Sequence, residues 1–307
     1  MREDLFDLIR EALRVKLTHR GTRFGVCSIM NVKSGACSED CAYCAQSRYH
    51  KTDSPIYPLR SEDDVLAHAE NAQKIGARRF SLVASGRGPT KGEVEKIARL
   101  IEKIRTNTDL LPCASLGIVG EGELRVLKDA GLVRYHHNIE TSKEYFPKIC
   151  TTHSFEERIE TMKAVKAVGL ELCSGCILGL GETESDRLSI VETLKELGVD
   201  SVPINVYVPI EGTRLARFGS RISPLDVIKT IAHFRIALKG PAIRLCGGRE
   251  KALLDFQALA FMAGADAMMV GGYLTTPGRE PSLDQRLIQE IIRFWISYET
   301  NHIKEAP

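Results

Sequence analysis

The chain has 307 residues, of which 43% are hydrophobic and 27% are charged, and its formal net charge is +2. This composition is typical of a soluble globular enzyme, and a single barrel domain commonly reaches about 250 residues. The small net charge and the lack of a basic block argue against a nucleic-acid partner, and no apolar stretch approaches the roughly 20 residues of a membrane span. The N-terminus predicts an amphipathic helix rather than a signal peptide, so we expect a cytoplasmic protein that binds small molecules.

Short apolar segments alternate with helical patterns along the chain, which is typical of βα units and a parallel sheet. We expect one domain over residues 1–307, with an N-terminal helix over about 1–18, a barrel over about 22–275 and a C-terminal helix over about 281–300. The predicted strands are Phe24–Asn31, Arg79–Ala84, Pro112–Gly117, Val133–Ile139, Leu170–Leu178, Ser201–Val208, Ala242–Cys246 and Ala267–Val270. Helical periodicity predicts Ser61–Lys74, Lys91–Thr106, Glu121–Ala130, Phe155–Val168, Glu184–Leu197, Pro224–Leu238, Lys251–Ala263 and Arg286–Trp295. This alternation predicts an α/β fold of the (βα)8 TIM-barrel type.

Three cysteines, Cys37, Cys41 and Cys44, follow the first predicted strand. A structural zinc site or a closed iron-sulfur centre takes four protein ligands, whereas a 4Fe-4S cluster held by three thiolates leaves one iron open. The run resembles that of radical S-adenosylmethionine (SAM) enzymes, in which the open iron binds SAM and an aromatic residue, here Tyr43, packs against the adenine. The alternative is half of a zinc ribbon whose partner pair lies elsewhere. Nine cysteines, an odd number, fit metal chemistry better than a disulfide scaffold.

Five motifs in order resemble the biotin synthase family. They are the cysteine run with the following Ala45–Ser47, then Tyr135–Thr141, Cys173–Glu182, Ser201–Asn205 and Arg244–Glu250. The resemblance implies insertion of sulfur between C6 and C9 of dethiobiotin. It also implies a flavodoxin or ferredoxin electron donor, an iron-sulfur assembly system as partner, and a homodimer. Both carbons carry unactivated C–H bonds that no side-chain base can deprotonate, so cleavage of SAM must supply a 5′-deoxyadenosyl radical.

An auxiliary cluster inside the barrel donates the sulfur in this family, and its expected ligands differ here. The common pattern of three cysteines and one arginine matches Cys113, Cys173 and Arg244, but Ser81 stands where the first cysteine is expected. One thiolate of the common set is therefore missing.

Two further cysteines, Cys27 and Cys246, occur at strand positions where the common form has smaller polar residues. We predict that these two, with Cys113 and Cys173, hold a larger auxiliary cluster, of the 4Fe type and with an additional sulfide to donate; a 2Fe-2S cluster is the alternative. Cys176 and Arg244 are alternative ligands. A buried cysteine can also be a small hydrophobic packing residue, which is the simpler interpretation for any of them.

Two more cysteines are assigned from strand periodicity and spacing. Cys173 and Cys176 point to opposite faces of a strand, unless the glycine between them bends it. Cys150 has no partner by spacing and is interpreted as a structural residue.

The resemblance also assigns polar residues to the two ligands. It implies that Asn138 and Glu140 contact the SAM ribose and the substrate ureido region, that Arg158 faces the SAM carboxylate, that Gly179 and Gly181 let the backbone approach SAM, and that Asn205 contacts the ureido group. The family usually has Asp at position 140 and Asn at position 136, so the role of His136 is open between a metal ligand and an ordinary barrel side chain. The simpler interpretations are a surface arginine for Arg158 and a backbone-satisfied amide for Asn205.

Two other functions remain open at this point. One is a radical SAM mutase or maturase of the methylornithine synthase type, which needs no sulfur donor and leaves the barrel cysteines unexplained. The other is a metal-binding protein without catalytic activity, which would not cleave SAM.

Two alanine variants distinguish the two predicted clusters. Cys37→Ala should abolish SAM cleavage, because the open cluster loses a ligand, whereas Cys113→Ala should spare cleavage and lose sulfur insertion. Both products, 5′-deoxyadenosine and biotin, can be quantified by mass spectrometry. Normal biotin formation by the Cys113 variant would rule out the predicted auxiliary donor.

Overall fold

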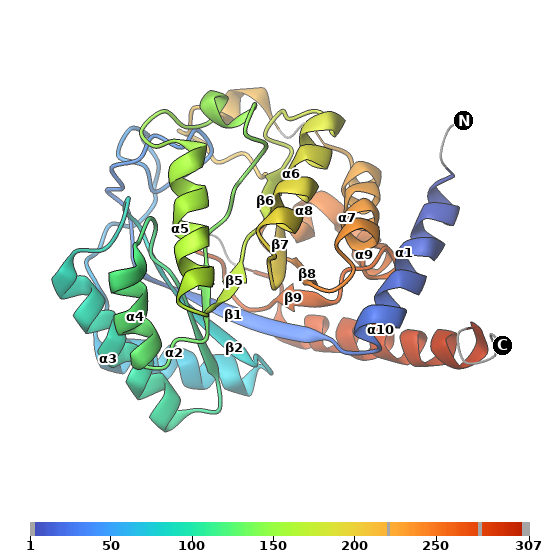
Figure 1. Cartoon of the computed structure of the whole chain (residues 1–307), viewed down its shortest axis with the longest axis horizontal. Coiled ribbons are helices and arrows are strands. Elements are labelled where there is room, and N and C mark those ends of the chain that lie inside the picture. Colours follow the sequence, from blue (N-terminus) through green and yellow to red (C-terminus); the bar gives the residue numbers. More distant parts are fainter. Residues whose placement is uncertain (1–3, 220–221, 276–277, 303–307) are drawn as a thin grey trace.

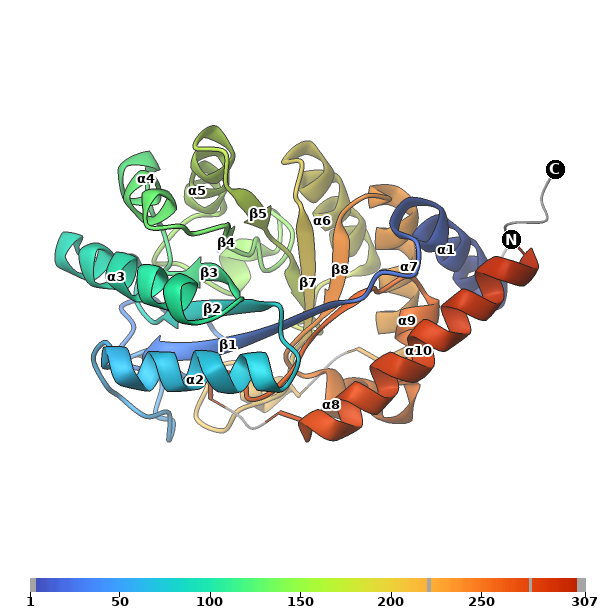
Figure 2. The same ribbon diagram turned by 90° about the horizontal axis from the view of Figure 1, so that it is seen from below.

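The computed structural model describes residues 4–219, 222–275 and 278–302. Within these residues, eight parallel strands close into a barrel with helices around it (Figures 1 and 2). The ring runs β1-β2-β3-β4-β5-β7-β8-β9 and returns to β1, with β6 continuing β5. The strands are β1 (Gly25–Lys33), β2 (Arg79–Ala84), β3 (Leu111–Ser115), β4 (Arg134–His136), β5 (Glu171–Cys173), β6 (Cys176–Leu178), β7 (Ser201–Val206), β8 (Ala242–Leu245) and β9 (Ala267–Met269). The (βα)8 prediction is confirmed.

The helices begin where the sequence supplies hydroxyl caps. At the start of four of them, Thr90, Ser154, Thr183 and Ser223 each accept a hydrogen bond from the backbone N–H three residues on, whose own acidic side chain reaches back. The N-terminal helix ends at Arg20, and residues 1–3 of its predicted span lie outside the described residues. The helices are α1 (Leu5–Arg20), α2 (Glu62–Lys74), α3 (Lys91–Asn107), α4 (Glu121–Asp129), α5 (Phe155–Ala167), α6 (Glu184–Glu196), α7 (Pro224–Leu238), α8 (Arg249–Leu253), α9 (Gln257–Met262) and α10 (Pro281–His302).

One predicted strand, Leu170–Leu178, is interrupted at its centre. The break lies at Ser174 and Gly175, between β5 and β6. A Cβ atom at position 175 would lie 2.0 Å from the carbonyl oxygen of Pro203 on the neighbouring strand, so only glycine allows this close approach. The interruption leaves the strand in its place in the barrel.

The prediction of one helix over Lys251–Ala263 is wrong. The chain forms α8, a short 3-10 turn over Leu254–Phe256, and then α9. Leu254 has a φ of +47°, which an α-helix cannot include. The break lets Gln257 and Asp284 both bind the buried guanidinium of Arg249, a tertiary contact that helical periodicity does not reveal.

Strand alternation sorts side chains into an outer and an inner set. Outward residues such as Leu82, Tyr135 and Met268 are fully buried beneath the helices and form the hydrophobic core. Inward residues are largely polar or sulfur-bearing and line a cavity. The polar and sulfur-bearing side chains therefore lie inside the ring, separated from the hydrophobic core by the strands themselves.

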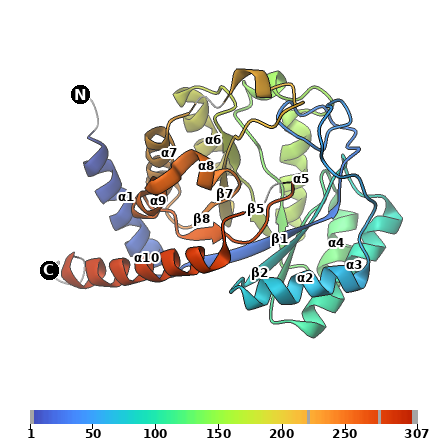
Figure 3. The same cartoon turned by 180° about the vertical axis from the view of Figure 1, so that it is seen from behind.

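The two terminal helices cover one side of the barrel (Figure 3). Helix α1 packs on α7 and α9, and α10 contacts α9. Trp295 of α10 is fully buried and stacks on Phe24. The Lys16 ammonium lies 2.9 Å from the centre of the Trp295 ring. None of the helices formed by the described residues is long and apolar enough to cross a membrane.

A buried ion network joins α1, α7 and β9. The carboxylate of Asp266 accepts hydrogen bonds from Arg20 Nε at 2.6 Å and from the backbone N–H of Ile243 at 2.8 Å. Arg235 Nη2 lies 3.2 Å from the same carboxylate, close enough for an ion pair although not aligned as a hydrogen bond. Arg235 and Asp266 are both fully buried.

Asp266→Asn should lower the free energy of unfolding by about 3–5 kcal/mol, because it leaves a buried guanidinium without its counter-charge. Urea unfolding followed by circular dichroism measures the loss. Glu11→Gln is the matched control: it removes an exposed ion pair with Arg14 and should cost less than about 1 kcal/mol. Equal effects of the two substitutions would contradict the importance of the buried network.

Candidate functional site

The loop after β1 carries Cys37, Cys41 and Cys44. Its conformation is fixed by backbone hydrogen bonds, including Cys37 N–H to Gln46 C=O at 2.9 Å and Cys44 N–H to Cys41 C=O at 3.0 Å. Ala36, immediately before the first cysteine, has a φ of +47°. All three cysteines line one pocket of about 170 Å³ at the barrel mouth, so the loop presents three sulfur atoms to a common space.

The residues between Cys37 and Cys41 attach this loop to the segment before α5. Asp40 accepts hydrogen bonds from Thr151 N–H at 2.8 Å and from the Thr151 hydroxyl at 2.6 Å. Burial acts to raise the pKa of Asp40, but these hydrogen bonds outweigh it and hold the pKa below its usual range. Glu39 Oε2 lies 2.5 Å from His153 Nδ1. The cysteine loop is thus held by a distant part of the chain.

Cys150 has a partner that its spacing did not predict. Its Sγ lies 3.8 Å from Sγ of Cys41 and 3.3 Å from Nδ1 of His153. Among the described residues, these three make up a group whose ligand atoms could hold a metal ion. The expectation that Cys150 has no partner is therefore wrong, because the loop and the segment before α5 meet at this point.

The same pocket also contains the polar residues that the sequence assigns to SAM, and it is called the SAM-side pocket below. Arg158 Nη1 donates to the Asn138 carbonyl at 2.9 Å and lies 3.6 Å from Glu140, whose carboxylate accepts a 3.2 Å hydrogen bond from Asn138 Nδ2. Arg158 Nε donates to His153 Nε2 at 3.1 Å. Tyr43 lines both this pocket and the barrel interior. Arg158 is a buried residue in this network rather than a surface arginine.

Asn138 and Glu140 do point the same way, although β4 has already ended at His136. Glu140 has a φ of +67°, outside the extended conformation that strand alternation assumes. Its carbonyl accepts the N–H of Ile177 at 2.9 Å, which fixes it against β6. The common direction of the two side chains is therefore a product of this tertiary contact.

The barrel interior forms a cavity of about 380 Å³ that contains the predicted auxiliary ligands. Cys27, Cys113, Cys173 and Cys246 are all buried and all line it, each from a different strand or strand end. Ser81, which replaces the expected cysteine, lies beside Cys113 in the β2–β3 register. Because Tyr43, Cys44 and Glu140 line this cavity and the SAM-side pocket, the two spaces share a wall.

Arg244 lies among these cysteines. Its Nη1 is 3.7 Å from Sγ of Cys173, and its Nε is buried without a hydrogen-bond partner among the described residues. Burial acts to raise the pKa of Cys173, but His136, Arg244 and Arg134 outweigh it and lower that pKa to about 6. His136 is thus a neighbour of Cys173. At neutral pH this environment favours a thiolate, the form that binds metal.

Three assigned residues lie outside the cavities. Cys176 is fully buried in the hydrophobic core and does not line the barrel interior, so the glycine between it and Cys173 has not turned it inward. Gly179 and Gly181 line neither the interior nor the SAM-side pocket. Their N–H groups donate to the carboxylate of Glu182, at 3.0 and 3.2 Å, and thereby close the turn after β6. The geometry therefore gives these glycines a turn-forming role.

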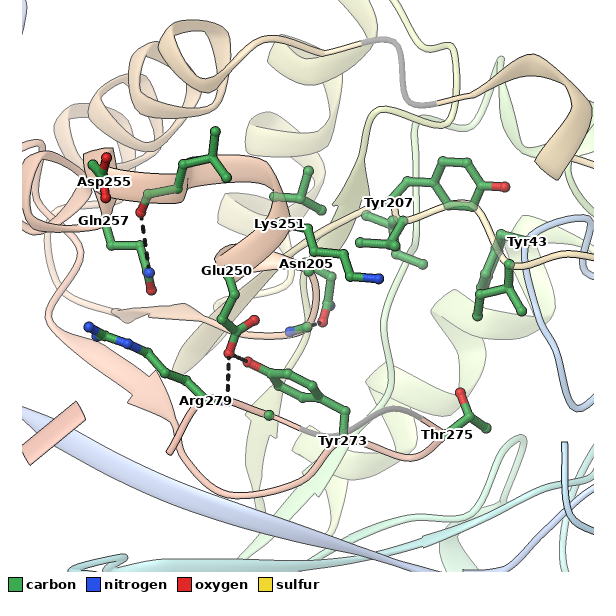
Figure 4. A pocket seen from close by; sticks show the side chains of 18 residues that line it. Tyr43, Asn205, Tyr207, Glu250, Lys251, Asp255, Gln257, Tyr273, Thr275 and Arg279 are labelled. Carbon is green, nitrogen blue, oxygen red and sulfur yellow. Dashed lines mark hydrogen bonds between the residues drawn. The ribbon is translucent and has the colours of Figure 1, made fainter. Parts of the chain in front are cut away.

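A wider pocket of about 820 Å³ opens at the ends of β7 and β8 (Figure 4). Asn205 lines both this pocket and the barrel interior. Its Nδ2 donates to the Cys176 carbonyl, and its Oδ1 accepts from the Gly247 N–H. One Nδ2 hydrogen remains available to a ligand. Tyr273 lines the same junction, and its hydroxyl donates to Glu250 at 2.6 Å, as Figure 4 shows.

Two arginines of the cavity were missed by sequence reasoning. Arg79 and Arg134 line the cavity from β2 and β4, two residues before Ser81 and His136 respectively. The period of two would have placed them on the inner face. Sequence reasoning placed Arg79 at the start of one predicted strand and Arg134 within another, and assigned a role to neither.

Comparison with known proteins agrees with this geometry. The model of the Radical SAM superfamily matches residues 31–194, and that of the Biotin and Thiamin Synthesis associated domain matches residues 203–291. The chain is 50% identical to a biotin synthase of Pelotomaculum thermopropionicum (94% of this chain, 89% of the relative) and 48% identical to one of Geobacter metallireducens (94% and 88%). The fold and the cysteine loop thus define a radical SAM protein. Within that superfamily, the chain belongs to the biotin synthase family.

Solved structures share the fold at low identity. A methylornithine synthase superposes with a TM-score of 0.81 at 18% identity, covering 98% of this chain and 92% of that protein. An FeFe-hydrogenase maturase from Carboxydothermus hydrogenoformans superposes with a TM-score of 0.77, also at 18% identity, covering 95% and 70%. Likenesses at this identity establish the barrel fold and carry no information on the reaction.

Arg158→Gln should weaken SAM binding by about 10-fold or more, because it removes a charge-assisted donor and leaves Glu140 without its buried counter-charge. Equilibrium dialysis of SAM against cluster-loaded protein under anaerobic conditions measures the change. Arg125→Gln, on the exposed face of α4, is the matched control and should leave binding unchanged. An unaltered dissociation constant for the Arg158 variant would contradict its assignment to SAM.

Proposed function

We propose that the protein is a biotin synthase that inserts sulfur into dethiobiotin by radical SAM chemistry. The observation that carries this proposal is one barrel interior that joins a three-cysteine loop at the mouth to four further buried cysteines. A reaction that abstracts hydrogen and then adds sulfur needs two such centres at opposite ends of one substrate cavity. Membership of the biotin synthase family supports the same assignment.

Cys37, Cys41 and Cys44 are proposed to hold the 4Fe-4S cluster that binds SAM. Three sulfur donors on one loop fit a cluster with one open iron, and Cys150, which lies 3.8 Å from Cys41, is not among the described residues that line this pocket. Around them, Tyr43, Asn138, Glu140 and Arg158 are proposed to orient SAM. The carboxylate of Glu140 suits ribose hydroxyls, and the Arg158 fork suits the SAM carboxylate.

Cys27, Cys113, Cys173 and Cys246 are proposed to hold the auxiliary cluster. Thiolate-bound iron-sulfur clusters are anionic, and the cavity is lined by three arginines, Arg79, Arg134 and Arg244, and by one carboxylate, Glu140. Glu171, which lies outside the cavity lining, pairs with Arg79 and Arg134, so Arg244 is the arginine left among the cysteines and suits an anion there. Arg244, with a buried unpaired Nε, is proposed to donate to that cluster rather than to replace a thiolate. Cys176 is left out of the proposed ligand set because it is buried in the core and does not line the cavity. The 4Fe type remains a prediction.

Dethiobiotin is proposed to occupy the interior between the two centres. Asn138 and Asn205 can donate to and accept from the ureido group, and Ile177 and Tyr43 offer apolar surface to the carbon chain. When bound, SAM and the two clusters supply the hydrogen-abstracting radical and the sulfur atom. The chain's own task is to hold the reacting carbons in line and to exclude water.

The two alternatives from the sequence receive no support. The two relatives described above are biotin synthases at 48–50% identity, whereas the likeness to methylornithine synthase, at 18% identity, is one of fold. A metal-binding protein without catalysis does not require a SAM-side pocket joined to a substrate-sized interior.

Several further points belong to the same proposal. We expect one barrel domain over the whole chain, because both halves contribute strands to one ring. A flavodoxin or ferredoxin would reduce the open cluster, an iron-sulfur assembly system would load both clusters, and two copies would form a homodimer. A cytoplasmic location suits nine free cysteines and oxygen-sensitive clusters.

Anaerobically reconstituted protein, given SAM, a strong reductant and dethiobiotin, should form biotin with more than one 5′-deoxyadenosine per product, since two hydrogens are abstracted. Mass spectrometry quantifies both compounds. Formation of 5′-deoxyadenosine without biotin would indicate a radical SAM enzyme that acts on a substrate other than dethiobiotin. Neither compound, from protein shown to carry both clusters, would contradict the proposed function.

A further inference from the structure

Two guanidinium groups at the bottom of the barrel each have an unused donor. Nη1 of Arg79 and Nη1 of Arg134 are buried, and neither has a hydrogen-bond partner among the described residues. Both side chains line the cavity that contains the four cysteines. A buried donor without an acceptor is costly, so the two groups indicate an acceptor that binds at this place.

The opposite ends of the same two guanidiniums are held by one carboxylate. Arg79 Nη2 donates to Glu171 Oε1 at 3.0 Å, and Arg134 Nε donates to Glu171 Oε2 at 2.8 Å. The side chain of Glu171 is 35% exposed, that of Arg79 is 18% exposed and that of Arg134 is 8% exposed. This arginine-glutamate bridge therefore reaches from solvent to the cavity, on the side away from the SAM pocket.

The strand register places the bridge beside the proposed auxiliary ligands. Arg79 is the β2 neighbour of Cys27, and Arg134 is the β4 neighbour of Cys113. Glu171 is the β5 neighbour of Arg134, and its carboxylate neutralises one of the two arginine charges. The remaining positive charge faces the cysteines and favours a small anion there.

We propose that Arg79 and Arg134 bind hydrosulfide and admit it to the auxiliary cluster through the floor of the barrel. This inference rests on the proposed function, because a cluster that gives its sulfur to the product must receive sulfur again. Hydrosulfide is small, and its negative charge suits two N–H donors, one from β2 and one from β4. Entry from this side uses the end of the barrel opposite to the pocket beside the cysteine loop.

The exchange that reports on this site is balanced without an oxidant. One labelled hydrosulfide ion enters, one unlabelled hydrosulfide ion leaves, and neither iron nor sulfur changes its oxidation state. The probe is sodium sulfide enriched in sulfur-34, added under anaerobic conditions to full-length protein carrying both clusters. Mass spectrometry of the acid-labile sulfide gives the rate of uptake, and a parallel Cys37→Ala protein assigns the label to the auxiliary cluster.

Arg134→Gln should slow label uptake by about 10-fold or more, the loss expected for a charge-assisted hydrogen bond, while the iron content stays unchanged. Glu171→Gln should have the opposite effect, lowering the sulfide concentration at half-maximal rate, because it frees both guanidiniums. Arg125→Gln, an exposed arginine of α4, is the control for charge and should match the wild type.

Two results would overturn the proposal. One is wild-type uptake by the Arg134 variant. The other is loss of auxiliary iron from that variant, which would mean that Arg134 holds the cluster and does not receive sulfide. A failure of the proposed function has a different signature: Cys113→Ala protein that keeps the full iron content and exchanges label normally would show that no donor cluster lies at these cysteines.

Discussion

Closure of the parallel barrel is the constraint on which the site depends. Each strand turns alternate side chains inward, so strands far apart in the sequence deliver residues to one small interior. In this chain the inward positions carry cysteine, arginine, histidine and asparagine in place of the branched aliphatic residues that usually fill such barrels. The interior is therefore a cavity lined largely by polar and sulfur-bearing side chains, and stability comes from the apolar layer between the strands and the helices.

The second constraint is charge. Arginine cannot shed its proton in a protein, so Arg79, Arg134 and Arg244 bring permanent positive charge into a space with few acceptors. An iron-sulfur cluster held by the cysteine thiolates would be an anion close to these positive charges. The cysteines and Arg244, whose Nη1 lies 3.7 Å from Cys173 Sγ, are then complementary parts of one site, each making burial of the other less costly.

The mouth of the barrel is organised by a connection between distant segments. Glu39 and Asp40 lie between two cysteines of the loop and bind residues 151–153, which precede α5. The same segment leads to Arg158, which contacts Asn138 and Glu140. A shift of the cysteine loop would therefore also shift the groups proposed to hold SAM, and the two are positioned as a unit.

The grouping of Cys27, Cys113, Cys173 and Cys246 was predicted by matching strand positions to the pattern of the biotin synthase family. The sequence by itself determined the class of fold, the approximate strand positions and the cysteine loop. These features depend on local periodicity and spacing, which a single chain displays directly. Only the tertiary structure decided which residues meet across the barrel. It alone decided that Cys150 lies beside Cys41, that Leu254 breaks a helix, that Gly179 and Gly181 serve a turn, and that Arg79 and Arg134 share Glu171. Such contacts join residues distant in sequence, and their energies depend on burial and on partners that no local pattern encodes.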